Sequence, residues 1–227
     1  MNFASKVTRL VSTGLLMGAS LLGVAHADTT VQVSETGLGL GQYTGGLQLP
    51  IQASAANFWA GLQTIKVTDG ASSSSFQAFC IDPYQWSSGT PSTYTQTSFS
   101  PTFDATHIAN ITKLFNYAYA SATTNLNAAA LQLALWEVAN DDGNLLTGGV
   151  KQTANTYASL VTATNSLLSS YGAYAGPSLY NLTFYKSGAQ QDFVTVSAVP
   201  EPGTYGMMLV GLGLIGTIAL RRKNRNS

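Results

Sequence analysis

The stretch FQAFCIDP, residues 76–83, holds the only cysteine of this 227-residue chain and decides how we interpret the rest. Its side chains alternate as in a strand, with Cys80 on one face and Phe79 and Ile81 on the other. Pro83 ends the strand, because proline cannot donate to a ladder of backbone hydrogen bonds. We therefore expect Cys80 to lie at the end of a strand.

A second stretch, LQLALWE at residues 131–137, has the pattern of a helix. Asn125 or Asn127 can cap this helix, and Gln132 and Trp136 then lie on one of its faces, one turn apart. Gln132 stands out as a polar residue among alanines and leucines. Its position predicts a buried amide that faces the same interior as Trp136.

The order of the expected elements predicts the fold class. Alternating runs predict strands at 31–33, 47–49, 62–68, 76–81, 179–185 and 192–198. A loop at 87–91 continues as a Ser/Thr-rich stretch to residue 102. Apolar residues recur at helical spacing after Asp104, again after Asn125 or Asn127, and again over 152–169. We expect an α+β fold, an antiparallel β-sandwich with a helical insert of about three helices, plus a separate C-terminal membrane helix.

The N-terminus has the features of a signal peptide over residues 1–27. Lys6 and Arg9 give it a positive start, the run 10–24 is apolar, and AHA at 25–27 suits signal peptidase. We expect the mature protein to begin at Asp28; a retained membrane anchor is the alternative.

The C-terminus, residues 199–227, carries a second targeting signal. It consists of three features in order, the residues Pro200, Glu201 and Pro202, an apolar run that predicts a transmembrane helix over 204–220, and the basic pair Arg221 and Arg222. This order resembles the PEP-CTERM sorting signal of Gram-negative bacteria. The resemblance implies export through the inner membrane, recognition by an exosortase, removal of the helix, and release or attachment at the cell surface beside exopolysaccharide and biofilm systems. A plain tail anchor is the alternative.

Charge excludes one class of partner. Between Asp28 and Glu201 the chain has four lysines and ten carboxylates, a net charge of −6. An acidic domain without a basic stripe is not expected to bind nucleic acid.

The lone cysteine has several interpretations, since it cannot form a disulfide within the chain. Cys80 can be a buried inert residue, half of an intermolecular disulfide, or a nucleophile paired with His107, the only histidine after the signal peptide. Lipid attachment is disfavoured because Cys80 is far from the mature N-terminus.

The segments FCIDP and LQLALWE resemble the thioester domains of bacterial surface adhesins, in which a strand cysteine bonds to a glutamine at a helix. The glutamine segment of that family typically has a β-branched residue where this chain has Leu135. The resemblance implies a thioester domain over residues 28–198 with a Cys80–Gln132 bond. The aromatic residues Trp136, Phe79, Tyr84 and Trp86 would shield this bond from water.

The function implied by this resemblance is covalent adhesion. An amine or hydroxyl on a host, cell or matrix target would attack the Gln132 carbonyl, and Cys80 would leave as thiolate. This is a single acyl transfer without turnover, so we expect no enzyme, no cofactor and no metal. The alternative is a non-covalent protein of the exopolysaccharide or biofilm matrix, or a carbohydrate-binding protein, with a structural cysteine.

Overall fold

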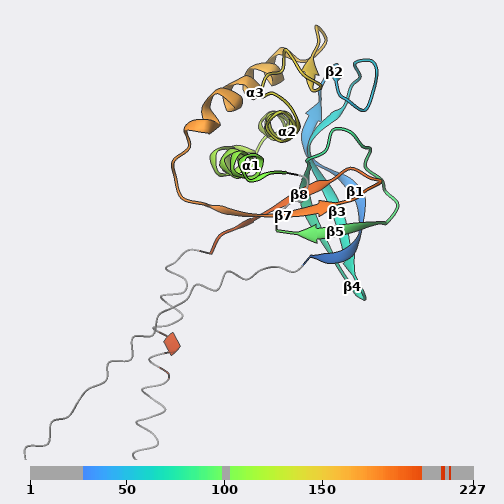
Figure 1. Cartoon of the computed structure of the whole chain (residues 1–227), viewed down its shortest axis with the longest axis vertical. Coiled ribbons are helices and arrows are strands. Elements are labelled where there is room, and N and C mark those ends of the chain that lie inside the picture. The colour runs from blue at the N-terminus through green and yellow to red at the C-terminus, as the bar shows by residue number, and fades with distance from the viewer. Residues whose placement is uncertain (1–27, 99–102, 201–210, 213–214, 216–227) are drawn as a thin grey trace, which may run out of the picture.

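Six antiparallel strands close into a barrel in the order β1-β3-β4-β8-β7-β5 (Figure 1). Their bounds are β1 (Thr29–Tyr43), β3 (Trp59–Asp69), β4 (Ser72–Cys80), β5 (Ser92–Thr97), β7 (Tyr180–Lys186) and β8 (Phe193–Ala198). A two-stranded sheet joins β2 (Leu47–Gln48) to β6 (Lys151–Gln152). The computed structural model describes residues 28–98, 103–200, 211–212 and 215.

The antiparallel sheet is as predicted, but the sandwich is not, because the strands form one closed barrel. Strand β1 has 15 residues and pairs with β3 on one side and β5 on the other. Its register against β3 shifts between Glu35 and Gly37 and again between Leu38 and Gly41. Such irregularities bend a strand. A long bent strand that pairs along both edges closes the sheet on itself, so two separate stacked sheets do not form.

Strand β5 was missed in the sequence, where it formed part of the Ser/Thr-rich stretch. Tyr94 and Thr97, three residues apart, are buried while Thr93 is exposed, so the burial does not follow the period of 2 that marks a strand. Because Tyr94 is the only apolar residue of β5, the sequence showed no alternation of apolar and polar residues there. The predicted strand at 47–49 is also shorter than expected and lies in the small sheet with β6.

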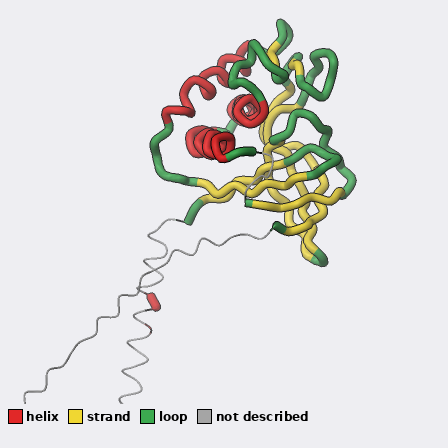
Figure 2. Tube along the Cα trace, in the orientation of Figure 1, coloured by secondary structure: helices red, strands yellow, loops and turns green. Residues whose placement is uncertain are grey.

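The three helices form an insert between β5 and β7, as predicted (Figure 2). They are α1 (Ala105–Ala118), α2 (Asn125–Asn140) and α3 (Ala158–Ser170), with short 3₁₀ turns at Tyr119–Ser121 and Tyr171–Ala173. Asp104 caps α1 as expected. Thr124, and neither predicted asparagine, caps α2. Helix α3 starts later than residue 152, because Gln152 pairs with Leu47 in the small sheet.

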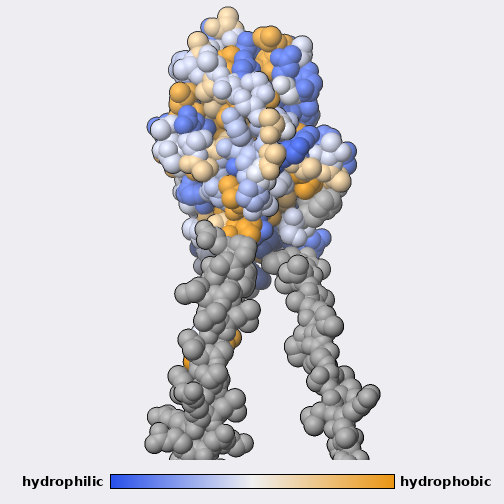
Figure 3. All heavy atoms as spheres, turned by 90° about the vertical axis from the view of Figure 1, so that its left-hand side faces the viewer, coloured by the Kyte–Doolittle hydropathy of each residue, from blue (hydrophilic) through white to orange (hydrophobic). Residues whose placement is uncertain are grey.

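Helix α2 is the centre of the molecule. All of its residues from Ala128 to Ala139 are buried, so it does not have the polar outer face of a surface helix. Ala129 and Leu133 pack in the barrel core, while Leu131 and Leu135 pack toward α1. The face of the helical layer in Figure 3 is mixed, with small groups of apolar residues among polar ones. Within the described residues, no helix has the length and apolar character needed to cross a membrane.

Candidate functional site

Cys80 is the last residue of β4, as the sequence predicted, and is almost fully buried. It shares a core cluster with Ala78 inside the barrel, whereas Phe79 and Ile81 face the helices. On one side, the backbone beside Cys80 is held by β8, where Ile81 N donates to Asp192 O at 2.9 Å. On the other side, the β3–β4 ladder already ends at the Gln63–Ala78 pair. The backbone of Cys80 therefore needs another partner on that side.

Gln132 is that partner. Its Oε1 accepts from Cys80 N at 3.0 Å, and its Nε2 donates to Cys80 O at 2.6 Å. The amide side chain thus continues the ladder that β3 leaves, from a position in the middle of α2. The sequence predicted that Gln132 would lie beside Cys80. The contact in the structure uses the Cys80 backbone, and both polar atoms of Gln132 are occupied by it.

The Cys80 thiol faces a different glutamine, which the sequence analysis missed. Sγ donates to Oε1 of Gln191 at 3.1 Å, and Gln191 is itself buried. The carboxamide is held from its other end, since Gln191 Nε2 donates to Asp82 O at 3.0 Å. The backbone is held as well, by Trp86 O and the Tyr94 hydroxyl. Gln191 is therefore fixed with its carboxamide against the sulfur.

The position of Gln191 in the sequence gave a weak indication that it lies near Cys80. It lies two residues before Phe193, the start of the closing strand β8, and β8 pairs with the end of β4 in the register Cys80–Phe193. Cys80 and Gln191 are 111 positions apart in the chain. Only the pairing of β4 with β8 brings the two side chains together.

A hollow of about 210 Å³ leads to this pair, and Cys80 and Gln191 are in its wall. Its aromatic wall residues are Tyr43, Phe58, Trp59, Trp86 and Trp136. Trp136 Nε1 and Gln63 Oε1, also in residues that line it, are buried without a hydrogen-bond partner in the structure. Buried polar atoms normally have a partner, so the residues around this hollow include one unsatisfied donor and one unsatisfied acceptor.

The four residues predicted to shield the site divide into two pairs. Trp136 and Trp86 line the hollow, and Trp86 stacks on Phe58 with ring centroids 5.9 Å apart. Phe79 packs in the other core cluster against Phe115, and Tyr84 is exposed; neither lines the hollow.

Electrostatics keeps the Cys80 sulfur protonated. Burial, with Glu35 and Asp82 as further causes, raises the pKa of the Cys80 thiol well above its usual range. His107 cannot activate it from its place at the start of α1, where its Nδ1 lies 2.9 Å from Asp104 Oδ1 and its ring lines another hollow. These observations argue against a cysteine hydrolase.

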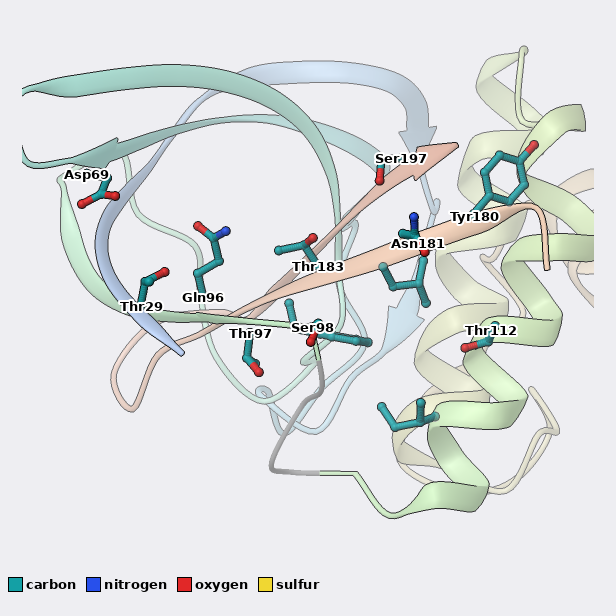
Figure 4. A pocket seen from close by; sticks show the side chains of 13 residues that line it. Thr29, Asp69, Gln96, Thr97, Ser98, Thr112, Tyr180, Asn181, Thr183 and Ser197 are labelled. Carbon is teal, nitrogen blue, oxygen red and sulfur yellow. The ribbon is translucent and has the colours of Figure 1, made fainter. Parts of the chain in front are cut away.

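A larger hollow, of about 650 Å³, lies elsewhere (Figure 4). Its labelled side chains come mainly from β5 and β7, and most carry a hydroxyl or an amide, such as Gln96, Asn181 and Thr183. Cys80, Gln132 and Gln191 are not among its lining residues. Size alone therefore does not mark the site of the thiol chemistry.

Comparisons with known proteins concern the C-terminal segment and the folded domain. Residues 198–223 match the model of the PEP-CTERM protein-sorting motif, which implies processing by an exosortase. Of the predicted sorting residues the structure describes only Pro200; Glu201, Pro202, Arg221, Arg222, the signal peptide and most of the predicted helix 204–220 lie outside the described residues.

Solved structures that are similar to this chain include two domains of bacterial surface proteins. One is the N-terminal domain of the Streptococcus pyogenes pilus tip adhesin Cpa, with a TM-score of 0.41 and 12% identity, over 73% of this chain and 99% of that one. The other is the N-terminal thioester domain of a surface protein from Clostridium perfringens, with a TM-score of 0.43 and 13% identity, over 75% and 100%. Comparison with curated proteins gives no significant match.

Proposed function

We propose that this protein is a surface adhesin that binds its target covalently through an internal thioester of Cys80. The contact that carries the proposal is the 3.1 Å approach of the Cys80 sulfur to the Gln191 carboxamide. A thiol and a carboxamide condense to a thioester and ammonia, so the two groups required are already side by side. The bond would lie at the wall of the aromatic hollow, partly sheltered from water.

The geometry favours Gln191 over Gln132 as the acyl partner. The sequence predicted the bond at Gln132, but both polar atoms of that side chain hold the Cys80 backbone. Forming a thioester there would expel Nε2 as ammonia and leave Cys80 O, a buried backbone acceptor, without this partner. At Gln191 the bond would replace the existing contact with the thiol, and the hydrogen bond lost with Nε2 is the one to Asp82 O, which is only partly buried. Gln132 then has a positioning role, fixing the Cys80 backbone so that Sγ faces Gln191.

The adhesion step is a single acyl transfer. A nucleophilic amine or hydroxyl of the target attacks the thioester carbonyl, the carbon–sulfur bond breaks, and the sulfur takes up a proton to regenerate the Cys80 thiol. The surroundings that raise the thiol pKa disfavour a free thiolate and so slow the loss of the bond to water. Because the acyl group is consumed, the protein is a binder and not a catalyst.

The proposed location follows from the sorting motif. After signal-peptide cleavage, an exosortase of a Gram-negative bacterium would remove the segment that follows Pro202. Residues 28–198 would then act at the cell surface or in an exopolysaccharide matrix or biofilm, on a host, cell or matrix target.

Intact-mass measurement of protein never exposed to amines tests the thioester. The folded protein should weigh one ammonia less than its sequence, and Cys80→Ala should restore the full mass. Methylamine should add to the protein and release one thiol, and peptide mapping should place the added group on Gln191. Full mass with a free thiol would refute the thioester. Methylamine on Gln132 would instead support the partner predicted from the sequence.

Variants of the two glutamines separate their roles. Gln191→Ala should abolish the mass deficit, whereas folded Gln132→Met should retain at least part of it. Loss of the deficit only in Gln132→Met would contradict Gln191 as the acyl partner.

The second candidate function, non-covalent carbohydrate binding, would use the hollow of Figure 4, whose hydroxyl and amide side chains suit a polyhydroxylated ligand. Glycan binding that persists in Cys80→Ala and is lost in Asn181→Ala would favour it.

A further inference from the structure

Three carboxylates gather at the C-terminal end of α2, away from the thiol site. Glu137 belongs to the last turns of the helix, Asp141 caps it, and Asp142 follows. One carboxylate oxygen from each lies within 4.8 Å of the others. The C-terminal end of a helix carries partial negative charge, so this placement is electrostatically unfavourable. Neither ion pair found among the described residues involves any of the three.

Glu137 has an oxygen that nothing in the protein satisfies. The residue is fully buried, its Oε2 accepts from Asn144 N at 2.9 Å, and its Oε1 has no hydrogen-bond partner. Burial, together with Asp141 and Asp142, raises the pKa of Glu137 to about 8. A buried carboxylate oxygen without a partner beside two other carboxylates indicates a missing positive ligand.

The loop after α2 holds the other two carboxylates in place. Asp141 Oδ2 accepts from the backbone N–H groups of Gly149 and Val150, at 2.8 and 2.6 Å. Asp142 Oδ2 accepts from the Thr147 hydroxyl. These bonds leave acceptor capacity on both residues, since an ionised carboxylate has about four lone-pair sites. Gly148 has a φ of 78°, and a side chain there would collide with the Asp141 carboxylate, so the loop is shaped around this group.

Access to the cluster is open. Asp141 and Asp142 line a hollow of about 550 Å³ whose wall also includes Asp104 and His107 at the start of α1. A hydrated ion can enter from this side while retaining some of its water.

We propose that Glu137, Asp141 and Asp142 form a calcium-binding site. All three donors are oxygens, which suits a hard cation, whereas zinc prefers nitrogen and sulfur ligands. Donors from a helix end and an irregular loop suit the flexible coordination of calcium better than the strict octahedron of magnesium. The ion would neutralise the helix end, satisfy Glu137 Oε1 and tie the loop at 141–150 to α2. The sequence analysis predicted no metal.

Thermal unfolding of the purified protein, with calcium as the probe, tests this site. Three carboxylates and an open face suggest a dissociation constant in the range of extracellular calcium modules, roughly 10⁻⁴–10⁻³ M. About 10 mM calcium chloride, compared with EGTA at matched ionic strength, should then raise the unfolding midpoint by roughly 3–10 °C. The same shift should occur in Cys80→Ala, which makes this result independent of the thioester.

Two variants complete the test. Glu137→Gln keeps the shape of the side chain and should lose at least half of the calcium-dependent shift, although it folds without calcium at least as well as the unmodified protein. Asp69→Asn removes an exposed carboxylate from the distant end of β3 and should retain the full shift. No calcium shift in the unmodified protein, or an undiminished shift in Glu137→Gln, would overturn the site. An equal shift with magnesium would overturn its assignment to calcium.

Discussion

Replacing Gln132 by methionine isolates the hydrogen bonds that α2 makes to the end of β4. Methionine has nearly the same length and volume, so it fills the site but can neither donate to Cys80 O nor accept from Cys80 N. The change is best made in a Cys80→Ala background, which retains the backbone groups of residue 80 and removes any contribution from a covalent bond.

The magnitude follows from the two contacts, at 3.0 and 2.6 Å, and from their burial. Each buried backbone group left without a partner costs about 1–3 kcal/mol. Since β3 no longer pairs beside Cys80, no strand can replace the lost amide. Gln132→Met should therefore lower the free energy of unfolding by about 2–5 kcal/mol.

Urea denaturation, followed by tryptophan fluorescence, measures this loss as a shift of the midpoint at constant slope. The matched control is Gln77→Met on the same strand. Gln77 is exposed and bonds only to the Thr64 hydroxyl, so the control should change stability by less than about 0.5 kcal/mol. A loss below about 1 kcal/mol for Gln132→Met would refute the positioning role.

Three further predictions follow. In Gln191→Ala the free Cys80 thiol should react slowly with iodoacetamide at neutral pH, and the rate should still rise above pH 9, because burial raises its pKa; a plateau below pH 9 would contradict this. Thr124→Ala removes the side chain that accepts from Asn127 N and should cost about 1 kcal/mol of unfolding free energy in urea. The raised pKa of Glu137, about 8 against an ordinary 4.5, means that in EGTA stability falls as pH rises from 4.5 to 8. Each pKa unit is worth about 1.4 kcal/mol, and a flat profile in the unmodified protein would contradict this.

The sequence predicted those helices and strands whose pattern is carried by neighbouring residues. Alternation located β4 and its end at Cys80, and helical spacing located α1 with its Asp104 cap. Closure into a barrel could not be predicted, because it depends on the bends in β1 and on its pairing with a hydroxyl-rich β5. Helix α2 was expected to have one buried face. It is buried on all sides because α1 and α3 cover the sides that the barrel leaves open.

For the site as well, the sequence indicated which residues to consider but not how their atoms are arranged. The sequence analysis, from the resemblance to thioester domains, expected a Cys80–Gln132 bond, and the structure brings these two residues together through the Cys80 backbone. It could not say which atoms meet. That depends on where the β3–β4 ladder ends, because the ladder leaves the Cys80 backbone free for Gln132.

The proposal of Gln191 as acyl partner rests on strand pairing. Antiparallel pairing sets Cys80 opposite Phe193, and Ile81 N bonds to Asp192 O, so residue 191 has to lie just beyond the end of β4. With Gln132 on one side of the Cys80 backbone and β8 on the other, the thiol is directed toward the Gln191 carboxamide, its observed partner. A one-residue slip of β8 would turn Gln191 to the other face of the sheet and separate the two groups. If the thioester forms, its formation therefore reports that β8 has paired in this register, which requires a nearly completed barrel.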